Sequence, residues 1–98
     1  MSEQRIERVT VTVRGYVQGV GFRWWTRYRA LELGLAGHAR NLDDGRVEVL
    51  VQGPSGAVDS MVRLLSERPS TAHRPGRVTG TVCQYGEPRN DVTSFTEW

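Results

Sequence analysis

The 98-residue sequence contains no lysine, only one cysteine and no long hydrophobic run. A single cysteine, Cys83, excludes an internal disulfide bond and a zinc site built from four thiolates. No apolar segment approaches the roughly 20 residues of a membrane-spanning helix, and no apolar stretch follows residues 1–5 as it would in a secretory signal. We therefore expect a soluble, cytoplasmic protein in which Cys83 is an ordinary strand residue.

Because lysine is absent, all 13 basic residues are arginines, which stand against 11 acidic residues and leave a net charge of +2. The planar guanidinium group of arginine matches phosphates and carboxylates, so this composition favours an anionic ligand. The net charge is too small to predict a nucleic-acid partner. The length suits one domain spanning residues 1–98, and we expect a monomer.

The first third of the chain predicts a strand, a loop and a helix. Valine recurs at every second position of residues 6–14, a spacing typical of a strand with one buried face. Residues 15–21 hold three glycines and are predicted to form a loop. Apolar residues then recur every three or four positions up to Gly34, which predicts an amphipathic helix. We assign three aromatic residues of this helix to the core: Phe22, Trp25 and Tyr28.

A hairpin and a second helix are expected next. The tight-turn sequence of residues 43–45, Asp-Asp-Gly, separates residues 37–42 from the alternating run 46–52, a pattern typical of a β-hairpin. Ser55 is the predicted N-cap of the helix that follows, and Pro69 ends it.

The last third predicts an exposed connection and two strands, at residues 77–85 and 93–98. His73, Arg74 and Arg77 are expected to be solvated charges. The element order is then strand, helix, strand, strand, helix, strand, with a short strand at the end. This order predicts an α+β protein with a ferredoxin-like split βαβ fold, in which both helices cover one face of an antiparallel sheet. Since this fold hosts many unrelated activities, it does not name the function.

The predicted loop at residues 15–21 can bind an anion. Backbone N–H groups can converge where a glycine-rich loop leads from a strand into a helix, and the helix dipole adds roughly half a positive charge there. Arg23, in the first helical turn, can fold back and offer two parallel donors to phosphate oxygens. The loop lacks the Gly-Lys-Ser/Thr ending of a P-loop, and its glycine spacing does not match a dinucleotide fingerprint. On spacing alone, an ordinary strand-to-helix turn remains the alternative.

Asn41, at the end of a predicted strand, is the second candidate. A carboxamide cannot act as a base near neutral pH, but it can hold a water molecule in a fixed orientation. The alternative is a turn-adjacent residue that bonds its own backbone. Asp43, Asp44 and Glu48 could be considered as magnesium ligands, but two of the three belong to a tight turn, and carboxylates facing an anion cradle would repel the anion. We therefore expect no metal site.

Two motifs in this sequence resemble those of the acylphosphatase family. Residues 15–23, Gly-Tyr-Val-Gln-Gly-Val-Gly-Phe-Arg, match the signature G-x-V-Q-G-V-x-F-R at every specified position. Residues 37–41, followed by Gly45, Val47 and Gly53, resemble the second signature. His38 departs from the pattern, because the family usually carries Trp, Phe or Tyr there. We interpret His38 as a packing substitution that adds a titratable group beside the site.

The resemblance implies an enzyme that hydrolyses acyl phosphates without a cofactor. Arg23 would bind the phosphate and Asn41 would position the attacking water. The backbone of the first loop would cradle the phosphoryl oxygens; its residues are Gly15, Tyr16, Val17, Gln18, Gly19, Val20, Gly21 and Phe22. An acyl phosphate releases a carboxylate whose conjugate acid has a pKa of about 4, so the reaction needs no general acid.

Two other functions stay open at this point. The first is a non-catalytic module that binds anions or RNA on the same fold, although the chain lacks the aromatic-rich motif of an RNA-recognition domain. The second is a role beside a larger carbamoyl-transfer protein, since such proteins carry a domain that resembles the acylphosphatases.

Overall fold

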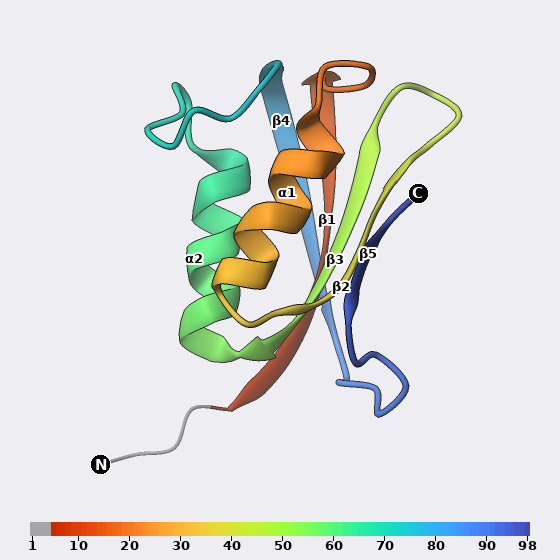
Figure 1. Cartoon of the computed structure of the whole chain (residues 1–98), viewed down its shortest axis with the longest axis vertical. Coiled ribbons are helices and arrows are strands. Elements are labelled where there is room, and N and C mark those ends of the chain that lie inside the picture. Colours follow the sequence, from red (N-terminus) through yellow and green to blue (C-terminus); the bar gives the residue numbers. More distant parts are fainter. Residues whose placement is uncertain (1–4) are drawn as a thin grey trace.

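A computed structural model describes residues 5–98. Figure 1 shows two helices lying side by side on one face of a twisted sheet. The elements in chain order are β1 (Ile6–Tyr16), α1 (Phe22–Glu32), β2 (Ala36–Asn41), β3 (Val47–Pro54), α2 (Ser55–Ser66), β4 (Arg77–Gly86) and β5 (Phe95–Glu97). No helix in this part of the chain is both long and apolar enough to span a membrane.

The strand order β4-β1-β3-β2-β5 confirms the predicted ferredoxin-like fold. The first four strands in this order are antiparallel to their neighbours, with β3 between β1 and β2. The last strand, β5, pairs with β2 in parallel, so the complete five-stranded sheet is mixed. The ends of β1 and β2 therefore point to the same edge of the sheet, where the loops that follow them can meet.

The core lies between the sheet and the helices. The predicted alternation in β1 holds: Val9, Val11 and Val13 are completely buried and stand opposite three buried valines of β3. Phe22 and Met61, one from each helix, are also almost completely buried. Burying a side chain of this size stabilises the fold by about 1.5–3 kcal/mol.

One part of the predicted core face of α1 is wrong. Phe22 and Trp25 are buried, but Tyr28 is 49% exposed, while Thr26 and Ala30 are completely buried. Successive residues of an α-helix are rotated by about 100° around its axis. A residue three positions further along therefore lies about 60° short of a full turn. Tyr28 is two such steps after Phe22 and therefore lies about 120° around the helix from it. Thr26, four positions after Phe22, stays on the core side.

The predicted first loop is also two residues too long. Strand β1 continues through Gly15 and Tyr16, which pair with β4 beyond a register shift between Arg14 and Gly15. Gly15 has a φ of 134°, and a Cβ there would overlap the carbonyl oxygen of Arg77. Glycine is thus what lets the strand pass the irregularity, and the loop itself begins at Val17.

Two smaller predictions also differ from the structure. The N-cap of α2 is Pro54 rather than Ser55, and its side chain makes no capping hydrogen bond. Arg74, expected to be a solvated charge, is only 9% exposed. Cys83 lies in β4 as predicted, and partial burial raises the pKa of its thiol.

Candidate active site

The sheet edge where β1 and β2 end brings the candidate residues together. Val13 of β1 pairs with Val47 of β3, and Val47 also pairs with Asn41 of β2. Adjacent strands lie about 4.8 Å apart, so Asn41 is about 10 Å from the β1 backbone along this row. The loop after β1 and the strand end that carries Asn41 therefore share one edge of the sheet, as the fold led us to expect.

The loop at residues 17–21 is fixed to the rest of the protein at three points. Val17 is almost completely buried, and Val20 packs against the core. The side-chain nitrogen Nε2 of Gln18 donates hydrogen bonds to the carbonyl oxygens of Leu42 (2.8 Å) and Arg46 (3.0 Å). These bonds tie the loop to the β2–β3 turn, immediately beyond Asn41.

The backbone amides at the start of α1 form the candidate anion cradle. Gly19 and Gly21 have positive φ values of 74° and 87°, and Gly21 is the N-cap of α1 without a side-chain hydrogen bond. Within residues 5–98, none of the amide groups from Val17 to Trp24 donates to another protein group. Unpaired donors at a helix N-terminus carry a partial positive charge and attract anions.

Arg23 borders a small concavity beside these amides. Its volume is about 90 Å³, roughly three times the share of one liquid water molecule, which suits a small anion. The residues that line it are Val17, Gly19, Gly21, Phe22, Arg23, Trp24 and Glu97. The guanidinium Nη1 of Arg23 donates to the carbonyl oxygen of Trp98, whose N–H in turn donates to the carbonyl oxygen of Ala39 at 2.9 Å.

Asn41 is the last residue of β2, and it is exposed to solvent. It therefore has access to water at the sheet edge that carries the cradle. Arg23 is linked through Trp98 to Ala39, two residues before Asn41. The guanidinium and the carboxamide thus belong to one region of the molecule.

Asp44, one of the two acidic residues of the turn, is paired with an arginine. The carboxylate of Asp44 contacts Nε of Arg46 at 2.7 Å, and the hydrogen bond from the Arg46 backbone N–H is the main reason that the pKa of Asp44 is lowered. Across residues 5–98 there is no group of three or more His, Cys, Asp or Glu side chains that could hold a metal ion.

His38 belongs to a cluster on the sheet face opposite the helices. Its Nε2 lies 2.7 Å from Oε2 of Glu48, which also accepts a hydrogen bond from Nε of Arg40 at 2.9 Å. Burial alone would raise the pKa of Glu48, but the hydrogen bonds from Arg40 and His38 outweigh it and lower the pKa. The His38 ring stacks on Trp98 at a centroid distance of 5.4 Å. This contact agrees with a packing role.

Three features of the site were missed in the sequence: the side-chain role of Gln18, and the presence of Glu97 and Trp98 beside Arg23. The first had a local signal, since Gln18 lies within the first motif. The other two had none, because Arg23 and Trp98 are 75 positions apart. Only the pairing of β5 with β2 brings the end of the described chain to the cradle.

The structure is that of a ferredoxin-like α+β protein with a candidate anion cradle at the start of its first helix. The family model described as acylphosphatase matches residues 9–96. An acylphosphatase of Corynebacterium efficiens is 54% identical over 90 residues, which cover 92% of this chain and 90% of the relative.

Two solved structures are similar over nearly their whole length. The acylphosphatase of Bacillus subtilis superimposes with a TM-score of 0.81 at 30% identity, covering 96% of this chain and 99% of the other. The structure from Coxiella burnetii, also an acylphosphatase, gives a TM-score of 0.83 at 29% identity and covers all of both chains. The chain described here belongs to the acylphosphatase family.

Proposed function

We propose that Arg23, Asn41 and the amides at the start of α1 carry out the hydrolysis of acyl phosphates. The phosphoryl group lies in the cradle, where the N–H groups of residues 17–24 and the Arg23 guanidinium stabilise its oxygens. The Asn41 carboxamide orients a water molecule toward phosphorus, in line with the departing carboxylate. The substrate is a small molecule, the mixed anhydride of a carboxylic acid and phosphate.

The chemistry of the substrate explains why this set of residues is sufficient. Water forms a new bond to phosphorus while the bond between phosphorus and the acyl oxygen breaks, and the acyl group leaves as a carboxylate. The proton of the attacking water passes to a phosphate oxygen. Phosphoryl transfer of this loose type depends mainly on positioning and on the stabilisation of charge on the equatorial oxygens. We therefore propose a reaction without cofactor or metal ion.

The observation that carries this proposal is the run of unpaired amides from Val17 to Trp24, held beside Arg23. The first N–H groups of a helix have no partner within the helix and carry a partial positive charge, so they favour an anionic ligand. Asn41 lies at the same edge of the sheet through its pairing with β3, and Gln18 ties the loop to the turn beyond it.

The experiment is an assay of a synthetic acyl phosphate with purified protein in EDTA. We expect hydrolysis by the wild type and a loss of about 10²–10³-fold in kcat for Arg23→Ala, the usual effect of removing an oxyanion donor. Asn41→Ala should lower kcat more than it raises KM. Arg27→Ala is the matched control, because Arg27 is an exposed arginine on the same helix. Full activity in Arg23→Ala would overturn the proposal.

The same experiment separates the alternative of a non-catalytic RNA-binding module. Tight, salt-sensitive RNA binding together with absent turnover would favour that module. We further propose that residues 1–98 act as one domain, as a monomer in the cytoplasm. A single peak of 11.0 kDa in sedimentation would support the monomer.

A further inference from the structure

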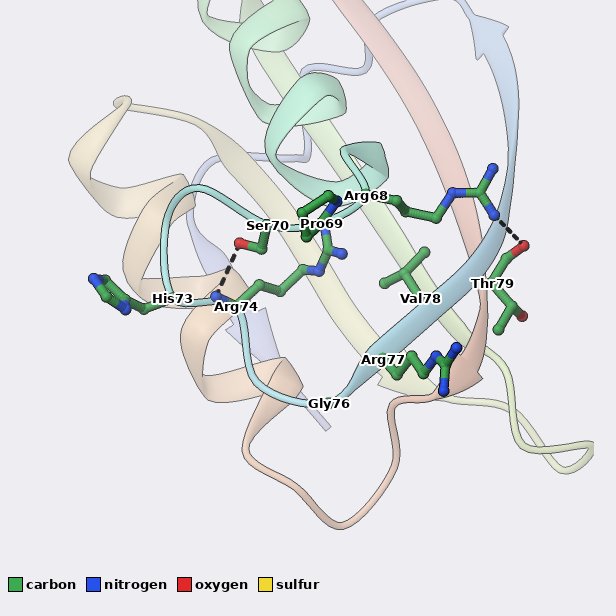
Figure 2. Close-up of a pocket in the computed structure, with 9 residues that line it drawn as sticks. All are labelled: Arg68, Pro69, Ser70, His73, Arg74, Gly76, Arg77, Val78 and Thr79. Carbon is green, nitrogen blue, oxygen red and sulfur yellow. Dashed lines mark hydrogen bonds between the residues drawn. The ribbon is translucent and has the colours of Figure 1, made fainter.

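A second cavity with a basic lining lies between the end of α2, the connection at residues 67–76 and the start of β4 (Figure 2). Its volume is about 560 Å³. None of its lining residues belongs to the concavity beside Arg23. They are Arg68, Pro69, Ser70, His73, Arg74, Gly76, Arg77, Val78 and Thr79.

Arg74 is the buried cation of this cavity. Its Nη1 donates to the carbonyl oxygens of Leu64 (2.8 Å) and Leu65 (3.1 Å) at the end of α2, while its Nε has no hydrogen-bond partner. Burial lowers the pKa of Arg74, and the charge of Glu67 only partly opposes this effect. A guanidinium group removed from water without a carboxylate partner is costly, and a nearby anion would offset that cost.

Arg68 and Arg77 add two further positive charges. Nη1 of Arg68 donates to the carbonyl oxygen of Thr79 at 2.6 Å, across the edge of β4. Within residues 5–98, Arg77 makes no hydrogen bond through its side chain, and none of the three arginines forms an ion pair.

Glu67 carries a negative charge that acts on Arg74. The carboxylate of Glu67 accepts hydrogen bonds from the backbone N–H and the hydroxyl of Thr71, and the first of these is the main cause of its lowered pKa. No acidic residue lines the cavity. In Figure 2, His73 points away from the other labelled side chains, so the charge of the cavity comes from the arginines.

The size and the walls of the cavity restrict the kind of ligand. A volume of about 560 Å³ lies in the usual range of small-molecule sites and exceeds what one phosphate ion fills. Pro69 provides an apolar part of the wall, and Val78, which is 4% exposed, adds a small apolar patch. Several arginine forks suit phosphate oxygens at more than one point.

We propose that this cavity binds a phosphorylated organic molecule that carries at least two anionic groups. The arginines neutralise the phosphates, and the organic part lies against Pro69 and Val78. The site is separate from the cradle at α1, so the proposal does not depend on the function assigned to Arg23.

The cavity is nevertheless next to the candidate active site. Gly76 lines it and packs against the carbonyl oxygen of Tyr16 and the side chain of Val20, so closely that a Cβ at Gly76 would overlap the Tyr16 oxygen. The next residue, Arg77, pairs with Tyr16 in the sheet. A ligand in the cavity would therefore touch the segment that supports the cradle from behind.

The test uses the full chain with Arg23→Ala, which removes the charged donor of the cradle. ADP and inorganic pyrophosphate are the probes, and binding is measured by calorimetry and by shifts of backbone amide resonances. We expect saturable binding of ADP in this background, with the largest shifts in residues 68–79. Pyrophosphate should bind more weakly, since it lacks the organic part.

Substitution at Arg77 provides the decisive comparison. Because Arg77 has no side-chain partner, Arg77→Gln should leave the fold intact and weaken ADP binding about tenfold, as expected for one charge-assisted hydrogen bond. Arg77→Glu should abolish binding. The matched controls are Arg89→Gln and Arg89→Glu, because Arg89 is an exposed arginine paired with Asp91.

Three outcomes would overturn the proposal. The first is that neither probe binds in the Arg23→Ala background, which would leave the cradle as the only anion site. The second is that the Arg89 variants lose as much affinity as the Arg77 variants, which would show unspecific charge attraction. The third is that the resonance shifts fall on residues 17–24 instead of residues 68–79. None of these results depends on whether the protein hydrolyses acyl phosphates.

Discussion

Gln18 joins the loop at residues 17–21 to the turn beyond Asn41, because its side-chain amide donates to the carbonyl oxygen of Leu42 at 2.8 Å. The same nitrogen also reaches the carbonyl oxygen of Arg46 at 3.0 Å. The two hydrogen bonds join residues that are 24 and 28 positions apart in the sequence. Gln18 therefore holds the loop that carries the cradle against the turn that follows the carboxamide.

Gln18→Ala should damage catalysis more than stability. Two lost hydrogen bonds would lower the free energy of unfolding by about 1–2 kcal/mol. The activity should fall by about 10–100-fold, because a displacement of about 1 Å between reacting groups can cost 10²-fold. Urea unfolding and acyl phosphate hydrolysis give the two quantities.

Gln52→Ala is the matched control for this variant. Its side chain also makes two hydrogen bonds, donating to the carbonyl oxygen of Arg89 and accepting from the Arg89 N–H, each at 2.8 Å. We expect a similar loss of stability with unchanged activity. If Gln18→Ala kept full activity, the loop would not need this connection.

Glu97→Gln should improve the binding of substrate. Glu97 lines the concavity beside Arg23, so its carboxylate opposes a bound phosphate. Removing this like charge should lower KM about two- to fivefold at low salt, and the effect should shrink as salt rises. Glu87→Gln, an exposed site in another loop, is the control. A loss of kcat above tenfold would instead show that the Glu97 carboxylate takes part in the reaction.

The fluorescence of Trp24 should report phosphate binding. The indole is 62% exposed, lines the concavity with Arg23 and stacks on Tyr28 with ring planes 3° apart. Phosphate in the cradle would change the electric field and the hydration at this ring. We expect a saturable change in emission on titration with inorganic phosphate that is lost in Trp24→Phe and in Arg23→Ala, but retained in Tyr28→Phe. An unchanged response in Trp24→Phe would contradict the placement of the anion.

Glu48 should make stability depend on pH in the acid range. The pKa of Glu48 in the folded protein is below the usual value of about 4.3. Its ionised form therefore contributes fully to the free energy of unfolding above that value, and this contribution is lost as the pH falls through the lower pKa of the folded state. The difference in unfolding free energy between the wild type and Glu48→Gln should thus be constant near neutral pH and shrink below about pH 4. Asp91→Asn, which removes an exposed ion pair with Arg89, should show a much smaller difference. A difference in unfolding free energy between the wild type and Glu48→Gln that grew as the pH fell would contradict this assignment.

Much of the site could be predicted because its elements are local in the chain. The alternating valines of β1, the glycines after it and the apolar spacing of α1 place a loop at the start of a helix, and Arg23 falls in the first turn. Backbone sterics and hydrophobic periodicity act over a few residues, so a short stretch of sequence is enough. The position of Asn41 followed less directly, from the strand order of the fold.

The failed predictions share a different origin. Tyr28 has the spacing of a core residue, but the line of contact between α1 and the sheet selects Thr26 instead. Tyr16 lies in a glycine-rich stretch, but pairing with β4 extends the strand past the irregularity at Gly15. The residues around Arg74 have the composition of an exposed loop. Arg74 is nevertheless buried, because its guanidinium caps the end of α2.

The sequence by itself determined the order of the elements, the glycine-rich loop before the first helix and the family, because short sequence patterns encode each of them. Tertiary structure alone decided which side chains surround that loop. The contacts of Gln18 with Leu42 and of Arg23 with Trp98 join parts of the chain far apart in sequence. Such contacts depend on sheet pairing and helix packing, which arise only when the whole chain buries its core together.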